Sequence, residues 1–335
     1  MEICSKIHSK NLVKWAKDKP EVFVLSADLT SSTEVDLFRD TYPDRFLSMG
    51  MAEQNMMSFA GGMAREGLFP FVHTFGVFIY RRALDQVSMS IAYPNLPVRM
   101  FGFLPGIMTP GGATHQAIDD IAIMRTLPNM TVLEVGDATE VETILAPAHA
   151  VDGPVYVRML RGDLPRIFPK KEPFVLNKAR LIKKGKDVTL FSSGICTEEA
   201  LRATEVLARR GVEIEHVHVS TLKPFSDPQI LASIEKASHG VITMENHTIL
   251  GGLGTCVSEV MTRVGMNKKL VKLGLKDTYA HGASRNYLMR EYGLDAMALV
   301  VSIEQLMGKT FKIKEEDLSS VRLEMVHSES KAEAL

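Results

Sequence analysis

The sequence has little of what a secreted, membrane-bound or nucleic-acid-binding protein needs. Its three cysteines, Cys4, Cys196 and Cys256, are far apart and show neither a disulfide framework nor metal-site spacing. No apolar run approaches the roughly 18 residues of a membrane-spanning helix, and the first residues lack the apolar core of a signal peptide. A net charge of −1 argues against nucleic acid or anionic membrane as a partner. We therefore expect a protein of the reducing cytoplasm.

Length and composition are those of a globular protein with two domains. The 335 residues are 45% hydrophobic and 24% charged, enough for two separate cores. Apolar runs alternate with helix-like stretches, which predicts an α/β fold with two domains, each a mostly parallel sheet flanked by helices. We expect strands at 22–25, 46–49, 68–72, 97–103, 130–135, 155–159, 187–191, 214–219 and 241–244, and helices at 55–65, 81–91, 198–210 and 255–264.

A stretch rich in proline and charge divides the chain. Pro165, Pro169 and Pro173 lie among charged residues, which is typical of a connection between domains. The last residues are polar and have no periodic apolar pattern. We therefore expect domains at 1–165 and 179–312, a linker at 166–178 and a polar tail at 313–335.

One carboxylate stands at the start of an otherwise apolar helix. Glu53 lies in the run Met51–Met57, and apolar residues, Phe59 among them, recur on both faces of the predicted helix. A helix that is apolar on both faces is buried, so we expect Glu53 to lie half out of water near the positive end of the helix dipole. It is either a carboxylate that binds backbone N–H groups at the helix start or a proton-handling group.

Two further motifs could form a ligand site with this carboxylate. Phe75 and Phe78 are three residues apart and could share one face of a helical turn, either as core packing or as one wall of a flat apolar slot. His115 follows Gly111 and Gly112, in a loop whose backbone can approach a ligand closely. A lone histidine is otherwise simply bound by a neighbouring group.

The order and spacing of the motifs resemble those of the transketolase family. They are Ser26–Thr30, Met51–Met57, Thr74–Phe78, Gly111–Gln116, Arg161–Pro165 and Glu245–Gly254, and the resemblance covers residues 1 to about 310. It implies a pyrimidine-binding domain followed by a transketolase C-terminal domain. It also implies a transferase of carbohydrate metabolism, which uses thiamine diphosphate to move a two-carbon ketol unit from an anionic, phosphorylated ketose to an aldehyde or ketone.

The resemblance implies roles for individual residues. Glu53 would hydrogen-bond the pyrimidine ring and so activate the cofactor, and His115 would contact the sugar near the reacting carbons. Other cofactor contacts would come from Asp28, Leu29, Phe75, Phe78 and Arg81. Substrate contacts would also come from Ser32 and Arg161, whose planar guanidinium suits a phosphate or sulfonate. Arg158 and Arg166 are alternatives to Arg161, whereas His281, Ser284 and Arg285 are given no chemistry.

The chain departs from the family pattern at three positions. Arg81 stands where a third aromatic residue is usual, Gly111 where an aspartate reads a sugar hydroxyl, and Phe103 where a second histidine is usual. The pocket that reads the sugar is therefore expected to be altered, and the substrate to be an unusual ketose.

One family motif has no counterpart in this sequence. The Gly-Asp-Gly…Asn motif, which binds metal and diphosphate, is missing, and the chain begins where the second domain of a full-length transketolase would begin. We therefore expect no metal ligands here, and a separately encoded subunit that brings Mg²⁺ and the diphosphate contacts into a heterotetramer. The alternatives are the β subunit of a 2-oxo acid dehydrogenase, a deoxyxylulose-phosphate synthase (normally one full-length chain) and a non-catalytic assembly subunit.

Overall fold

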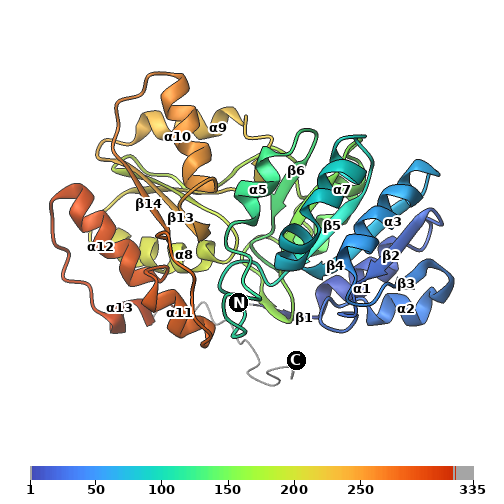
Figure 1. The fold of residues 1–335 in the computed structure, drawn as a ribbon. Helices are drawn as coiled ribbons and strands as arrows, with labels where there is room; N and C mark the ends of the chain where they lie inside the picture. Colours follow the sequence, from blue (N-terminus) through green and yellow to red (C-terminus); the bar gives the residue numbers. More distant parts are fainter. Residues whose placement is uncertain (1, 320, 322–335) are drawn as a thin grey trace.

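The computed structural model describes residues 2–319 and 321 and shows two α/β units side by side (Figure 1). Its strands form a seven-stranded, a five-stranded and a two-stranded sheet. The α/β fold with two mostly parallel sheets flanked by helices is thereby confirmed. Within these residues, no helix combines the length and the apolar character that crossing a membrane requires.

The seven-stranded sheet is the core of the first unit. In spatial order its strands are β12 (Thr221–Lys223), β6 (Thr131–Glu134), β7 (Val155–Met159), β5 (Arg99–Phe103), β4 (Phe69–Phe75), β2 (Val22–Ser26) and β3 (Phe46–Ser48). The pairs are parallel, except that β12 runs antiparallel to β6. All six strands predicted here are confirmed. Strands β5 and β7 are buried along their whole length, as expected of parallel strands covered on both faces.

Helices pack on this sheet. They are α1 (Ile7–Trp15), α2 (Asp36–Thr41), η1 (Pro43–Arg45), α3 (Glu53–Arg65), η2 (Phe78–Arg82), α4 (Ala83–Gln86), η3 (Val87–Ala92), α5 (Asp120–Thr126), α6 (Ala138–Thr143) and α7 (Leu145–His149). The helix predicted at 81–91 is α4 between two π-helical turns, η2 and η3. The expectation that α3 is buried on both faces is wrong, because Phe59 is 46% exposed.

The second unit is built on the five-stranded sheet. Its strands, in spatial order, are β14 (Leu270–Leu275), β13 (Gly240–Thr248), β10 (Val188–Ser192), β11 (Ile214–His218) and β9 (Arg180–Lys183), and only β9 pairs antiparallel. Its helices are α8 (Cys196–Ala208), α9 (Pro228–Lys236), α10 (Leu253–Arg263), α11 (Arg285–Glu291), α12 (Ala296–Met307) and α13 (Glu315–Ser319). Strand β12 follows β11 in sequence but lies at the edge of the first sheet, so it ties the two units together.

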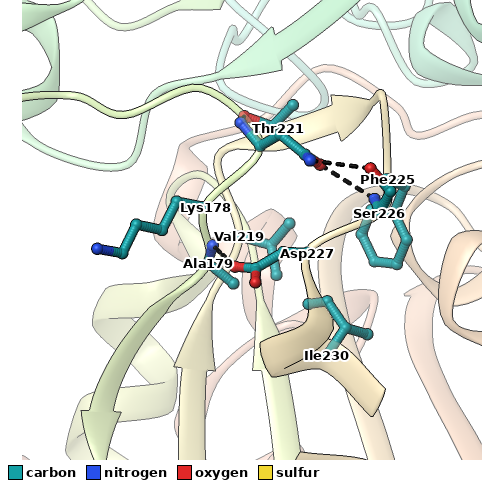
Figure 2. A pocket seen from close by; sticks show the side chains of 9 residues that line it. Lys178, Ala179, Val219, Thr221, Phe225, Ser226, Asp227 and Ile230 are labelled. Carbon is teal, nitrogen blue, oxygen red and sulfur yellow. Dashed lines mark hydrogen bonds between the residues drawn. The ribbon is translucent and has the colours of Figure 1, made fainter. Parts of the chain in front are cut away.

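Hydrogen-bonded backbone frames the segment proposed as the linker. Before it, β8 (Asp163–Pro165) pairs with β1 (Ile3–Ser5). After it, the Ala179 N–H donates to Asp227 at 2.5 Å (Figure 2). The side-chain amide of Asn177 also donates to Ser226 Oγ at 2.9 Å and accepts from the Ser226 N–H at 3.0 Å. The cavity at this corner measures about 10 Å³, room for one water at most, so we read the corner as structural.

The proposed polar tail is partly ordered into helix. Within it, α13 packs on α8 and buries Leu318, which is 4% exposed. This part of the proposed tail is therefore packed against the second unit. Residues 320 and 322–335 lie outside the described residues.

Candidate active site

Glu53, Phe75 and His115 lie at or after the carboxyl ends of three parallel strands of the first sheet. Glu53 follows β3, Phe75 ends β4, and His115 lies in the loop after β5, residues 104–119, here called the His115 loop. Ligands of parallel α/β sheets bind at this edge. The centre of the His115 ring is 5.5 Å from that of Phe78 and 6.4 Å from that of Phe75. Motifs that are 40 residues apart in sequence thus meet in one place.

Glu53 is a buried carboxylate with a cationic partner. It is the first residue of α3 and is 3% exposed, not half out of water as expected. Its two oxygens accept hydrogen bonds from Nη1 of Arg82 at 3.1 and 3.2 Å. A buried charge is costly unless it is paired. Arg82 therefore balances the charge of Glu53 and fixes the orientation of its carboxylate.

A flat wall of two rings and one guanidinium stands beside this carboxylate. The rings of Phe75 and Phe78 are 5.9 Å apart and 25° from parallel. The guanidinium of Arg82 lies 4.0 Å from the centre of the Phe78 ring, and its side chain is 49% exposed. A flat heteroaromatic ring can stack on such a wall while a polar group at its edge reaches the carboxylate.

The sequence predicts a cofactor contact for Arg81 and none for Arg82, yet Arg82 is the arginine that lies beside Phe78. The chain forms a π-helical turn, η2, from Phe78 to Arg82, and such a turn contains one more residue than an α-helical turn. In an α-helix the residues three and four positions after Phe78 would both lie near its ring. In this wider turn it is Arg82, four positions on, that lies over the ring. Arg81 instead donates to the Ala113 carbonyl at 2.8 Å and pairs with Asp119 at 3.0 Å. The two consecutive arginines after the Phe pair were the signal that could have found it.

Two neighbours set the position of His115. Its Nδ1 lies 2.9 Å from Thr114 Oγ1, and its backbone N–H donates to the Gly112 carbonyl at 2.9 Å. A Cβ atom at Gly111 would come within 3.1 Å of both Cβ and Cγ of His115. Gly111, which stands in place of the usual aspartate, therefore packs directly against the His115 side chain.

Phe103 does not line the pocket, contrary to the expectation. Its side chain is fully buried, and its ring packs 5.6 Å from that of His8 and 6.1 Å from that of His73. The Nε2 atoms of the two histidines are 3.1 Å apart, and burial lowers the pKa of His8 to about 3. Phe103 thus belongs to the core between α1 and the sheet.

Two other predicted substrate residues, Arg161 and Ser32, lie side by side. Nη1 of Arg161 donates to the Ser32 carbonyl at 2.6 Å. Next to them the buried Glu34 accepts the Gly162 N–H at 2.7 Å, and burial raises the pKa of its carboxyl. Glu34 thereby fixes the turn that follows Arg161.

The other two arginines of this stretch are bound elsewhere. Arg158 is wholly buried and pairs with Asp120 at 2.8 Å and Glu134 at 2.5 Å. Arg166 pairs with Glu2 at 2.9 Å and with Glu142. Of the three candidates, Arg161 is the one that contacts the loop after β2.

The loop after β2 carries the remaining predicted cofactor residues. Asp28 is exposed and has a left-handed backbone conformation, with φ of 64°. The carbonyl of Leu29 accepts from the N–H and the hydroxyl of Thr33, each at 2.8 Å. Within residues 2–319 and 321, no group of three histidine, cysteine or acidic side chains could hold a metal ion.

Comparison with known proteins agrees with this arrangement. Residues 4–166 match the family model described as transketolase, pyrimidine binding domain, and residues 177–299 match the one described as transketolase, C-terminal domain. A 6-deoxy-6-sulfo-D-fructose transketolase subunit of Clostridium sp. is 38% identical over 292 residues, which cover 86% of this chain and 89% of that protein. A 1-deoxy-D-xylulose-5-phosphate synthase of Chlorobium phaeovibrioides is 31% identical over 304 residues, and 47% of its length is covered.

A solved structure gives the same result. The protein described as "Split gene transketolase, inactive beta4 tetramer" superposes with a TM-score of 0.82 at 36% identity, over 90% of this chain and 97% of that one. Both family models, the similar chain lengths and the common fold lead to one conclusion: this chain belongs to the transketolase family.

Proposed function

We propose that this chain is the C-terminal subunit of a two-chain, thiamine-diphosphate-dependent transketolase. The observation that carries the proposal is the buried Glu53 carboxylate beside the Phe75–Phe78 wall. A non-catalytic assembly subunit would have no use for this charge, since a buried ion pair contributes little to stability compared with apolar packing.

The residues of the site suit the aminopyrimidine part of thiamine diphosphate. The ring would stack on the wall of Phe75 and Phe78, and Glu53 would share a proton with a ring nitrogen, away from water. When bound, the cofactor supplies the carbon nucleophile that carries the ketol unit. His115 and Arg161 would orient the sugar, the first near the reacting carbons and the second at its anionic end.

A partner chain would complete the site. The described residues offer no acidic cluster for Mg²⁺, and Glu53 and the aromatic wall account for only the pyrimidine end of the cofactor. One relative is named a transketolase subunit and one solved structure a split gene transketolase, so division of this enzyme between two chains has precedent. We propose that a separately encoded subunit brings the metal and diphosphate site, in a heterotetramer.

The proposed donor is a ketose with an anionic tail, with a preference for a modified or branched sugar. Arg161 suits either phosphate or sulfonate. Gly111 removes the side chain that usually reads a sugar hydroxyl, and His115 packs directly against it, 3.1 Å from where a Cβ atom would lie. The relative named for 6-deoxy-6-sulfofructose indicates that sulfonated ketoses occur as substrates within the family.

Reconstitution with the partner tests this function. The partner is sought as the product of a neighbouring reading frame with the Gly-Asp-Gly…Asn motif, and the two chains are purified together. We expect Mg²⁺-dependent binding of thiamine diphosphate and ketol transfer by the pair, and neither by this chain alone. Donors to compare by kcat/KM are xylulose 5-phosphate and 6-deoxy-6-sulfofructose, each with ribose 5-phosphate as acceptor.

Three outcomes would contradict parts of the proposal. Turnover by this chain alone would remove the need for a partner. Formation of deoxyxylulose phosphate from pyruvate, or reduction of a lipoyl carrier, would assign the chain to one of the alternative activities. Equal or better turnover of the common pentose phosphates would show that Gly111 does not alter specificity.

A further inference from the structure

The His115 loop is closed at its base by its own backbone. The Gly106 N–H donates to the Ala117 carbonyl at 2.7 Å, where Pro105 and Ala117 form a single β-bridge. Arg81 binds the tip of the loop through Ala113, as described above. These contacts fix the base and the tip of the loop. The conformation of the residues between them depends on contacts with other parts of the molecule.

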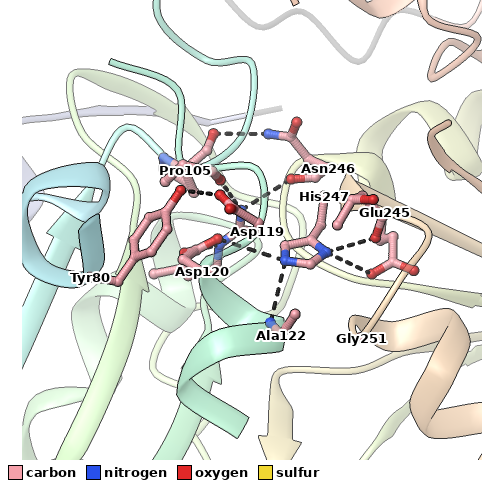
Figure 3. A network of polar contacts seen from close by, with 12 residues as sticks. Tyr80, Pro105, Asp119, Asp120, Ala122, Glu245, Asn246, His247 and Gly251 are labelled. Atoms are coloured by element: carbon pink, nitrogen blue, oxygen red, sulfur yellow. Dashed lines mark hydrogen bonds and ion pairs between the residues drawn. The ribbon is translucent and has the colours of Figure 1, made fainter. Parts of the chain in front are cut away.

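One side chain of the C-terminal domain makes two hydrogen bonds to the base of this loop. The amide of Asn246, near the end of β13, donates to the Pro105 carbonyl at 3.0 Å (Figure 3). It also accepts from the Ile107 N–H at 3.0 Å. Asn246 is fully buried, and a Cβ atom at Gly106 would lie 2.1 Å from its Oδ1. We call this arrangement of Pro105, Gly106, Ile107 and Asn246 the Asn246 clasp.

Buried charge and backbone contacts hold the clasp in place. Nη2 of Arg158 donates both to the Ala117 carbonyl at 2.8 Å and to the Asn246 carbonyl at 3.1 Å. The Thr248 N–H donates to the Ile118 carbonyl at 2.8 Å. The clasp, the loop base and the strand that carries Asn246 are therefore parts of one hydrogen-bonded network.

A second segment of the C-terminal domain contacts the middle of the loop. Nε2 of Gln116 donates to the carbonyls of Thr109 and His281, each at 3.3 Å. A Cβ atom at Gly112 would lie 3.3 Å from the backbone of Gly282. The C-terminal domain thus meets the loop on both sides of His115.

We infer that the C-terminal domain positions His115, and that Asn246 is the positioning residue. This rests on the proposed function, in which His115 contacts the sugar. Only an amide offers a donor and an acceptor in one plane to a carbonyl and an N–H two residues apart. A carboxylate in the same place would oppose the Pro105 carbonyl, acceptor against acceptor. The backbone hydrogen bond at the base of the loop would then remain, but the hydrogen bond that fixes the conformation of the loop at Pro105 would be lost.

Hydrogen exchange on the purified chain tests the clasp without any assay of activity. In Asn246→Ala and Asn246→Asp we expect amides of residues 104–118 to exchange at least about tenfold faster, while those of α3 are unchanged. The control is Asn177→Ala, which removes from the linker corner an amide that also donates one hydrogen bond and accepts another, both with Ser226. Its effect should stay near residues 177–180 and 225–229.

A variant on the loop side guards against general unfolding of the Asn246 variants. In Gly106→Ala the new methyl group would clash with Asn246, at a position where φ is +58°. Gly67→Ala is its control, because φ there is +84° and open space surrounds the Cβ position. Faster exchange of residues 104–118 in Gly106→Ala but not in Gly67→Ala supports the clasp. Unchanged exchange in the folded variants overturns it.

The reconstituted enzyme supplies the second readout. Asn246→Asp should lower kcat/KM for the donor ketose about ten- to hundredfold and leave the Kd of thiamine diphosphate unchanged, because only the group that contacts the sugar moves. If the wild-type pair shows no ketol transfer, the proposed function fails, yet hydrogen exchange still decides the clasp. An equal loss of cofactor affinity would show that Asn246 supports the whole site and does not position His115.

Discussion

At the scale of the residue, Glu53 and Arg82 form the pair on which the proposed chemistry depends. The carboxylate is 3% exposed and the arginine 49% exposed, so only one member of the pair is accessible to water. A ligand that enters beside Phe78 therefore meets a buried acid whose orientation is already set. Preorganised groups of this kind lower a barrier because no rearrangement is needed during the reaction.

Glu53→Gln tests whether this carboxylate handles a proton. The amide keeps the size of the side chain and cannot take the proton, so kcat of the reconstituted pair should fall about a hundred- to ten-thousandfold. Glu215→Gln is a matched control. Glu215 is 1% exposed and pairs through both oxygens with Lys236, which is 49% exposed, at 3.2 Å. Near-normal turnover of an assembled Glu53→Gln enzyme would make the carboxylate structural.

At the scale of the element, the π-helical turn η2 carries two consecutive arginines, of which one lies at the proposed cofactor site. Within this turn Arg82 lies over the Phe78 ring, whereas Arg81 binds the His115 loop. π-helical turns are frequent at functional sites. Arg81 and Arg82 are thus neighbours in sequence but contact different parts of the site.

Exchange of the two arginines for alanine separates these tasks. Arg82→Ala should weaken the binding of thiamine diphosphate by about tenfold or more, since a charge-assisted hydrogen bond to Glu53 and one end of the stacking wall are lost. Arg81→Ala should leave that Kd unchanged and lower kcat/KM for the donor, because it releases Ala113. Calorimetry and steady-state kinetics on the reconstituted pair measure both. The reverse pattern would restore the assignment of the cofactor contact to Arg81.

The same element shows how far a site can be predicted from sequence. Glu53, Phe75, Phe78 and His115 could be brought together because they lie after consecutive parallel strands, whose carboxyl ends meet at one edge. Arg82 could not be told from Arg81, since residues three and four positions after Phe78 both approach its ring in a helix. The role expected for Phe103 was wrong because its burial depends on α1, from a distant part of the chain.

At the scale of the whole molecule, the two α/β units were predictable and their connection was not. Alternating apolar runs indicated both sheets, and six strands of the first were placed correctly. Strand β12, by contrast, joins the sheet of the other unit, and Arg158 binds the Asn246 carbonyl across 88 positions of sequence. Such pairings depend on how finished units pack against each other, which local patterns do not describe.

Buried titratable groups on both units determine how the stability of the whole chain depends on pH. Burial lowers the pKa of His8 and His216 to about 3 and that of His247 to about 4, from an ordinary value of 6.5. Below pH 6.5 the unfolded chain therefore takes up protons that the native chain does not, and stability is lost. Burial raises the pKa of Glu198 and Glu245 to about 7, from 4.5, so these carboxyls favour the native chain as the pH falls from 7 to 4.5.

The two effects oppose each other above about pH 4.5, and below it the histidines act alone because the carboxyls are protonated in both states. Each uncompensated proton removes about 1.4 kcal/mol per pH unit. Three histidines oppose two carboxyls, so we expect the free energy of unfolding in urea to fall at the rate set by about one uncompensated proton per molecule between pH 6.5 and 4.5, and about two to three times as steeply just below pH 4.5. His216→Asn should flatten that fall, and His239→Asn, at an exposed position, should not. A decline that is equally steep above and below pH 4.5 would mean that the buried carboxyls do not compensate the histidines.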